Sequence, residues 1–281
     1  QEYIHNGQGP QPFFWRAPTD NDYGAKLPTR LKAWREASYQ TPKAESFNVS
    51  KDGDKSIVKV TYRFPQVDAQ WEITYKVFAN GIIKVDNRFV AEGTETPMIP
   101  RVGLRMQLSE ILNDLTYYGR GPEENYRDRR TSQFIGEYTT PIKDLYEPYI
   151  RPQENEHHTD IYWCALTTKQ KAGLLFIADR TFELNASNYL LGSLDSGETI
   201  DNGAPRTNET NHRHLTDPQP VKQVDMFIDY RMMGVGGDNS WGAIAHEPYL
   251  IRPGVENTIE YGFSIVPFDK KADYKNLIYQ Y

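Results

Sequence analysis

The segment GVGGDNSWG, from Gly234 to Gly242, combines residue types that suit a sugar-binding loop. The indole of Trp241 offers a flat apolar face to the C–H groups of a pyranose, and Asp238 and Asn239 offer directional hydrogen bonds to its hydroxyls. Because this tryptophan does not lie on an alternating apolar strand, we interpret it as a stacking platform. The alternative is a tryptophan that folds back onto a sheet, and the composition of the segment does not separate the two.

A second candidate is the segment YIRPQENEHHTD, over residues 149–160. Glu154 and Asn155 follow Pro152, which predicts a rigid, exposed turn whose side chains accept and donate hydrogen bonds to sugar hydroxyls. His157 and His158 are adjacent, so on a strand they would point to opposite sides and would make poor joint metal ligands.

The segment NHRHL places His212 and His214 two residues apart, on one face if the chain is extended. Such a pair could bind a metal or perform acid–base chemistry near neutral pH. No third ligand is evident nearby, so a structural or supporting role is favoured, and we assign no metal to this chain. His214 is kept as a candidate substrate-binding residue.

Adjacent carboxylates occur in YYGRGPEENYRDRR, at Glu123 and Glu124. Retaining glycosidases need two carboxyl groups about 5–5.5 Å apart on either side of the scissile bond. Neighbours in one loop rarely flank a bond, so ion pairing is the preferred interpretation and an interface with another domain is the second. The possible cationic partners are Arg120, Arg127, Arg129 and Arg130.

The segment FFWRAPTDNDYG carries Asp20, Asn21 and Asp22. It lacks the further acidic position and the glycine that an EF-hand calcium loop requires at set offsets. We therefore expect a turn whose carboxylates pair with Arg16 or cap backbone amides. Contact with a sugar hydroxyl or with an adjoining domain is the alternative.

The elements that must position these residues are mostly strands. Period-2 alternation is dense, for example at Val224, Met226 and Ile228, and hairpin turns are predicted at residues 52–53 and 80–81. Helical periodicity is confined to residues 27–38. The pattern predicts an all-β chain, a large antiparallel β-sandwich forming a single domain over residues 1–281. Residues 118–160 alternate poorly and are expected to form a long functional loop.

The composition excludes several classes of protein. The 281 residues carry a formal net charge of −6 and contain no long basic run, which argues against nucleic-acid binding. No window is apolar enough to span a membrane. Cys164 is the sole cysteine, so an internal disulfide is impossible, and its apolar surroundings predict burial. The chain starts at Gln1 without a signal peptide, as a processed product or fragment would, so the compartment stays open.

Five motifs occur together and in order: FWRAPTDND, YYGRGPEENYRDRR, YEPYIRPQEN, HRHL and MGVGGDNSWG. Over nearly the whole chain, this set closely resembles the C-terminal domain of family 2 β-galactosidases, which is also the small chain of two-chain enzymes. The resemblance implies a supersandwich fold like that of the galactose mutarotases. It also implies that Trp241 stacks on the sugar, chiefly at the aglycone subsite, with Asn239 where the bacterial prototype has aspartate.

The resemblance further implies hydrolysis of terminal β-D-galactosides with retention. The catalytic glutamates and the magnesium ligands would lie in a TIM barrel that this chain lacks, so we expect no catalytic residue or cofactor here. The chain alone would be inactive, and its partners would be a β-galactoside and the barrel domain or large subunit.

Two alternatives stay open. The first is a free-standing carbohydrate-binding module, which predicts measurable galactose or lactose affinity in the isolated chain. The second is a mutarotase-like epimerase, which needs an acid and a base on either side of the anomeric carbon. His214 or His158 together with Glu154 are the available sets for that chemistry.

Overall fold

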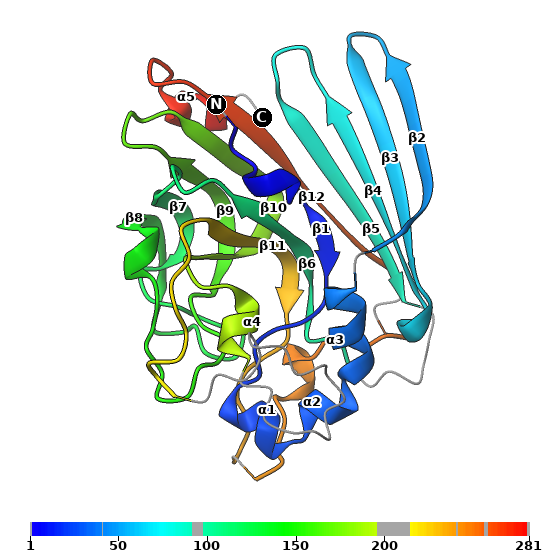
Figure 1. The fold of residues 1–281 in the computed structure, drawn as a ribbon, viewed down its shortest axis with the longest axis vertical. Coiled ribbons are helices and arrows are strands. Elements are labelled where there is room, and N and C mark those ends of the chain that lie inside the picture. The colour runs from blue at the N-terminus through cyan, green and yellow to red at the C-terminus, as the bar shows by residue number, and fades with distance from the viewer. Residues whose placement is uncertain are drawn as a thin grey trace.

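The computed structural model describes residues 2–40, 42–91, 98–195, 214–239, 241–255 and 258–279. These residues form a large antiparallel sheet accompanied by short helices (Figure 1). The strands are β1 (Gln11–Phe13), β2 (Ala44–Asp52), β3 (Lys55–Phe64), β4 (Ala69–Val77), β5 (Ile83–Ala91), β6 (Arg101–Leu108), β7 (Asp114–Gly121), β8 (Phe134–Pro141), β9 (His158–Thr167), β10 (Gly173–Ser187), β11 (Val224–Met232) and β12 (Thr258–Phe268).

The helical segments are short. The α-helices are α1 (Asp20–Gly24), α2 (Leu27–Arg30), α3 (Lys32–Tyr39), α4 (Leu191–Leu194) and α5 (Tyr274–Ile278). The 3-10 helices are η1 (His5–Gly7), η2 (Pro65–Val67), η3 (Ile142–Asp144) and η5 (Glu247–Tyr249). In the part of the chain that the structure describes, none of the helices is long and apolar enough to cross a membrane.

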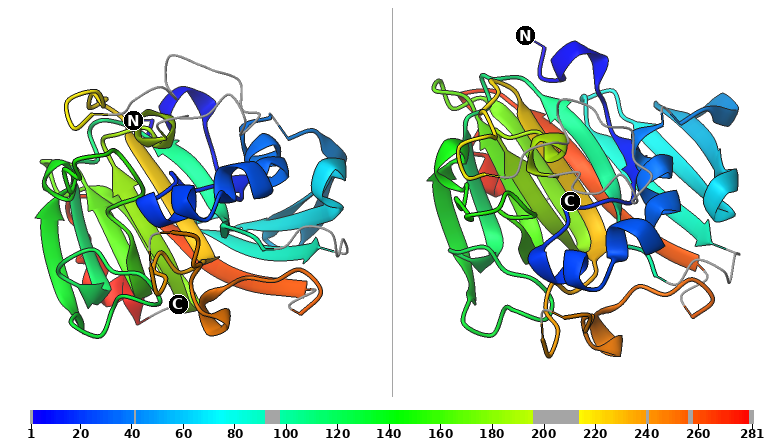
Figure 2. Two further views of the ribbon diagram at one scale, coloured as in Figure 1. Left: turned by 90° about the horizontal axis from the view of Figure 1, so that it is seen from below. Right: turned by 60° about the horizontal axis from the view of Figure 1, so that its bottom comes forward.

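The sheet divides into two branches at β10. The first part of β10, Gly173–Ala178, pairs with β12, whereas its last part, Glu183–Ser187, pairs with β11. One branch therefore runs β12-β5-β4-β3-β2, and the other runs β11-β6-β1. Strands β9, β7 and β8 continue from the opposite edge of β10. Figures 1 and 2 show the resulting curl, in which β2–β5 stand apart from β6 and β11. The expected sandwich is thus one curled antiparallel sheet whose branches face each other.

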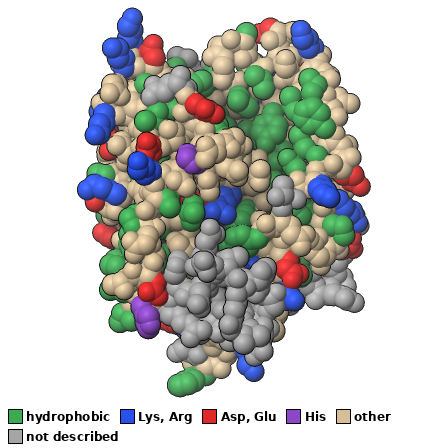
Figure 3. Space-filling model, in the orientation of Figure 1, with side chains coloured by type: hydrophobic (Ala, Val, Ile, Leu, Met, Phe, Trp, Pro, Cys, Tyr) green, Lys and Arg blue, Asp and Glu red, His purple; other side chains and the backbone are tan. Residues whose placement is uncertain are grey.

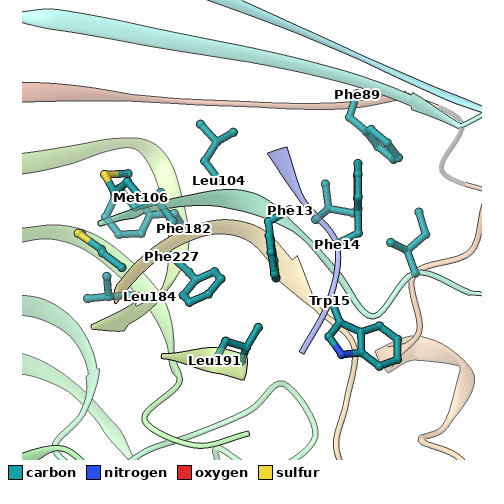
Figure 4. Close-up of a cluster of buried hydrophobic side chains, with 14 of the residues drawn as sticks. Phe13, Phe14, Trp15, Phe89, Leu104, Met106, Phe182, Leu184, Leu191 and Phe227 are labelled. Carbon is teal, nitrogen blue, oxygen red and sulfur yellow. The ribbon is translucent and has the colours of Figure 1, made fainter. Parts of the chain in front are cut away.

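The main core fills the space between the two branches. Phe14 follows β1 and contacts Trp71 of β4 and Phe89 of β5, with ring centroids 5.5 and 5.4 Å apart. Phe13 lies beside Phe227 of β11 at 5.4 Å (Figure 4). Large rings from both branches thus bury one another, and this burial stabilises the packing of the two branches.

Local predictions from the sequence are mostly confirmed. The hairpins β2–β3 and β4–β5 turn where the Asp-Gly and Asn-Gly pairs predict. The helix expected over residues 27–38 is present, but Leu31 interrupts it with φ −111° and ψ 17° and separates α2 from α3. Cys164 is buried in β9, as predicted.

The long loop expected over residues 118–160 is only partly a loop. It contains the end of β7 and all of β8, which pairs with β7 from Asp114↔Pro141 to Gly121↔Phe134. Alternation was weak there because β8 is an edge strand with most of its side chains half-exposed or exposed, so neither face carries a clear apolar pattern.

Candidate functional site

The segment after β11 forms a projecting loop at the end of the molecule that carries α1 and α2 (Figure 1). Trp241 is 91% exposed in this loop. The alternative in which its ring folds back onto the sheet is therefore wrong for this structure. The loop instead holds the indole in solvent, where this side chain gains none of the free energy that burial would give.

The two polar candidates beside Trp241 have different contacts. The side-chain oxygen of Asn239 accepts hydrogen bonds from the backbone N–H groups of Trp241 at 2.9 Å and Ala243 at 3.4 Å. Asn239 therefore shapes the turn that holds the indole. Asp238 is exposed, and its carboxylate lies 2.9 Å from Nε2 of His246. Ser240 lies outside the described residues.

The stem of the loop is held by the first motif of the chain. Arg16 donates to the carbonyls of Met233 at 2.6 Å and Gly234 at 3.0 Å, and its guanidinium is paired with Asp22. Asn21 donates to the carbonyl of Val235 at 3.1 Å. The predicted pairing between Arg16 and a carboxylate of this segment is confirmed.

The same segment caps its own helix. Asp22 and Thr19 form a reciprocal capping box at the start of α1. Asp20 turns away from this box and lies 3.4 Å from Arg151. The predicted capping role for the carboxylates is therefore confirmed for Asp22.

The second anchor of the loop is Asp128, which the sequence did not single out. Its carboxylate accepts hydrogen bonds from the backbone N–H groups of Val235 at 3.1 Å and Gly236 at 2.7 Å. A Cβ at Gly234 would clash with Asp128 Oδ2, and one at Gly236 would lie 3.0 Å from it. The glycines are therefore needed because the carboxylate approaches the backbone closely.

Of the adjacent carboxylates Glu123 and Glu124, the second is ion-paired. Glu124 pairs with Arg129, accepts a hydrogen bond from the hydroxyl of Tyr149, and accepts another from the backbone N–H of Glu156 at 2.9 Å. Ion pairing was the preferred prediction for these glutamates, and it is confirmed for Glu124.

The expectation that Glu154 and Asn155 lie on an exposed turn is wrong, because both are 3% exposed. Glu154 accepts hydrogen bonds from Arg101 Nη2 at 2.8 Å and from the backbone N–H of Ala17 at 3.0 Å. Burying a carboxylate is unfavourable unless it is paired in this way. The sequence shows that Pro152 precedes a turn, but it does not show that Arg101, on a distant strand, covers it.

Glu154 belongs to a buried polar network, which also holds His157, Glu183, Asn185 and Asp229 beside Arg101. Asp225 and Asp229 are fully buried, so β11 is covered on both faces, whereas alternation suggested one buried face. Phe227, on the same face between these two aspartates, was the available signal for the second buried face.

His157 is the centre of this network. Its Nε2 lies 3.0 Å from Glu183 Oε2, and its Nδ1 lies 2.7 Å from Asn185 Oδ1. Since Arg101 donates to that same amide oxygen, both ring nitrogens of His157 face acceptors, which suits the doubly protonated ring. Burial opposes the charge, but the hydrogen bond and charge of Glu183 leave the pKa of His157 raised.

The network also reaches the Trp241 loop. Glu183 Oε2 accepts a hydrogen bond from the backbone N–H of Met232 at 2.7 Å, at the end of β11 where the loop begins. Burial raises the pKa of Asp229 to about 7, against the attraction of Arg101, whose Nε lies 3.1 Å away.

His158 and His214 are separate from this network. The ring nitrogens of His158 lie 3.0 Å from the carbonyl of Glu156 and 3.2 Å from that of Pro122, and burial lowers the pKa of His158. His214 is exposed, and its backbone N–H donates to Asp217. His212 lies outside the described residues. Because Glu154 and His158 are buried and hydrogen-bonded, they do not form the open acid–base pair that an epimerase requires.

A cavity of about 150 Å³ lies beside the stem of the loop. Its lining includes Asn21, Tyr126, Tyr149, Glu154 and Val235. Pockets that enclose whole small-molecule ligands measure about 300–1,000 Å³. This cavity is therefore smaller than a pocket that encloses a whole small-molecule ligand.

Comparison with known proteins was made against families, curated sequences and solved structures. The family model described as "Beta galactosidase small chain" matches residues 1–265. The β-galactosidase of Priestia megaterium is 33% identical over 86% of this chain and 22% of its own length. That of Streptococcus thermophilus is 31% identical over 89% of this chain and 23% of its own length. The chain thus spans less than a quarter of the curated relatives that it matches.

Among solved structures, galactose 1-epimerase from Lactobacillus acidophilus aligns with 80% of this chain and 66% of its own, at 8% identity and a TM-score of 0.44. A GalM/aldose epimerase homologue from C. elegans aligns with 79% of this chain and 68% of its own, at 11% identity and a TM-score of 0.40.

Proposed function

The chain belongs to the β-galactosidase small-chain family, and from this premise we propose that it completes the active site of a retaining β-galactosidase. In this proposal Trp241 stacks on the substrate, chiefly at the aglycone subsite. The reaction is hydrolysis of terminal β-D-galactosides, and the catalytic glutamates lie in a large chain or barrel domain outside these residues.

The observation that carries the proposal is an exposed indole on an anchored stem. Burying a large apolar side chain is worth about 1.5–3 kcal/mol, and Trp241 forgoes that gain while Arg16, Asn21 and Asp128 hold the backbone beneath it. A ring held out in this way is available for a ligand or a partner surface. The partial cavity beside the stem supports the same proposal, since a substrate would need a second wall.

The remaining candidates take different roles in this proposal. Asp238 is exposed beside the indole and can accept a hydrogen bond from a sugar hydroxyl. Asn239 holds the turn. Glu154 is buried and bonded to Ala17, the residue after Arg16, and Asn155 is buried too, so in this proposal neither touches the sugar. His214 stays a candidate contact on exposure alone.

Magnesium belongs to the large chain in this proposal. In the described part of this chain, no three or more His, Cys, Asp or Glu side chains are grouped so that they could hold a metal. What this chain supplies is binding and orientation, and it moves no proton in the reaction.

Association with a large chain has a second line of support. Phe47 and Val49 on the edge strand β2 are 66% and 59% exposed, and they pair with Val60 and Val58 of β3. Both side chains lie on the side of that branch that faces the core, but outside the core itself. Figure 3 shows hydrophobic side chains gathered over this part of the molecule, at the upper right. An exposed apolar edge of this kind suits a protein interface.

The test is Trp241→Ala in the complete enzyme, with lactose as substrate. Stacking predicts a higher KM or a changed transfer to acceptor sugars. Tyr279→Ala is the matched control, because Tyr279 is 89% exposed just after α5, at the opposite end of the molecule (Figure 1). Unchanged kinetics for Trp241→Ala would refute the stacking role. Lactose hydrolysis by the isolated chain would refute the assignment of the catalytic glutamates to another chain or domain.

A further inference from the structure

A cleft opens on the sheet where its two branches separate. Strand β12 leaves β10 after Ala178, and β11 joins it only at Glu183, so residues 179–182 of β10 pair with neither strand. The cleft has a volume of about 690 Å³, within the range of about 300–1,000 Å³ typical of small-molecule sites. Its lining shares no residue with the cavity beside the Trp241 loop.

The wall formed by β4, β5 and β12 carries alternating charges. On these strands Trp71, Phe89 and Ile259 are buried in the core, so their neighbours in sequence face the other side. The register aligns Glu72 with Arg88, and Arg88 with Glu260. One row of the wall is therefore acid, base, acid, and the Arg88 guanidinium lies 3.5 Å from Glu260.

The next row along these strands also lines the cleft. Thr74 aligns with Asp86, and Asp86 aligns with Gly262. A Cβ at Gly262 would lie 2.5 Å from Asp179 Oδ2 and 2.9 Å from Lys84 Nζ. Lys84 is ion-paired with Asp179. Polar side chains thus converge over a bare stretch of backbone, where any larger residue would collide with them.

Two tyrosines also line the cleft. Tyr230 of β11 and Tyr261 of β12 approach across the gap between the branches, with ring centroids 6.2 Å apart. The hydroxyl of Tyr261 donates to the carbonyl of Ile228 at 3.2 Å, which fixes that ring, and Tyr230 is half-buried. An aromatic pair therefore lines the cleft together with the polar rows.

The chemistry of the lining selects the ligand. Four carboxylates and two guanidinium groups line the cleft, so an anion is disfavoured, and the polar rows disfavour an apolar ligand. Adjacent acceptors and donors match hydroxyl groups, which both donate and accept, and a tyrosine ring matches the C–H face of a pyranose. We propose that this cleft is a binding site for a neutral saccharide, separate from the Trp241 loop.

Saccharide binding in this cleft does not depend on the proposed hydrolysis of galactosides by the assembled protein. The isotope-labelled 281-residue chain is titrated with lactose while backbone amide shifts are followed by NMR. The proposal predicts saturable shifts at Thr181, Tyr230 and Gly262, which persist in Trp241→Ala. Arg88→Ala should weaken this binding about tenfold, because Arg88 is the central donor of its row.

Two further variants keep the test decisive. Glu260→Gln replaces an exposed acceptor at the rim without a change of shape, and it should also weaken binding. Arg63→Ala, at an exposed ion pair on β3, is the matched control and should leave the affinity unchanged. The proposal is overturned if lactose shifts no amide of the cleft, if these shifts vanish in Trp241→Ala, or if Arg88→Ala binds as well as the unmodified chain. Failure of the Trp241 kinetics alone would leave it standing.

Discussion

Replacing Asp128 tests whether the anchored stem matters for substrate binding. The carboxylate accepts hydrogen bonds from two backbone N–H groups at 3.1 and 2.7 Å. Hydrogen bonds to a charged group contribute about 1.5–3 kcal/mol each, and partial exposure reduces this because water can replace the carboxylate. Asp128→Ala should therefore free the stem without unfolding the sheet.

The effect on substrate binding has an upper limit set by Trp241. Aromatic stacking is worth about 0.5–1.5 kcal/mol, which corresponds to a rise in KM of about 2- to 12-fold when the indole is removed. Loosening the stem cannot cost more binding free energy than removal of the indole does. Asp128→Ala should raise the KM for lactose by no more than Trp241→Ala does, with kcat changed less than KM.

The assay is a double-mutant cycle in the complete enzyme. If Asp128 acts through the indole, its replacement should add almost nothing to the KM of Trp241→Ala. Asp144→Ala, at an exposed ion pair, is the control for loss of one carboxylate. Equal and additive effects in both backgrounds would show that Asp128 acts by another route. An unchanged KM for Asp128→Ala would show that the stem needs no anchor.

The other predictions concern Gly236 in the stem, the buried network around His157, and Arg16. Gly236→Ala should reproduce the KM effect of Asp128→Ala with little change in the melting temperature, because its Cβ would lie 3.0 Å from the carboxylate. The free energy of unfolding should fall as pH rises between about 4 and 7 because of Asp229, and above about 6.5 because of His157, by about 1.4 kcal/mol per pH unit for each extra proton that the folded chain holds. His157, with its pKa raised, is protonated below that pKa and loses this stabilisation above it, and Asp229, with its pKa raised to about 7, acts in the same direction. Urea unfolding across this range measures the slope, which His157→Gln should flatten; a rise in stability with pH would contradict the assignment. Arg16→Ala should destabilise the chain by about 3–5 kcal/mol, since it leaves a buried carboxylate unpaired, and a thermal shift small enough to match an exposed ion pair would refute that.

The sequence by itself determined the structural features that depend on residues close together in the chain. The hairpins at residues 52–53 and 80–81 and the capping box at Asp22 are set by turn chemistry and short-range hydrogen bonds. The antiparallel all-β architecture followed from period-2 alternation, and the family followed from five motifs in order. The hairpins and the capping box are each specified by residues that lie close together in the sequence.

Tertiary structure decided which polar groups are buried and what they contact. Glu154 was expected on the surface because Pro152 precedes it, but Arg101 and Ala17, 53 and 137 residues away in the sequence, enclose it. Asp128 holds the stem from 107 residues away. Alternation shows that a strand has two faces, but it does not show what covers the second face. That depends on the change of partner along β10, which no local pattern encodes.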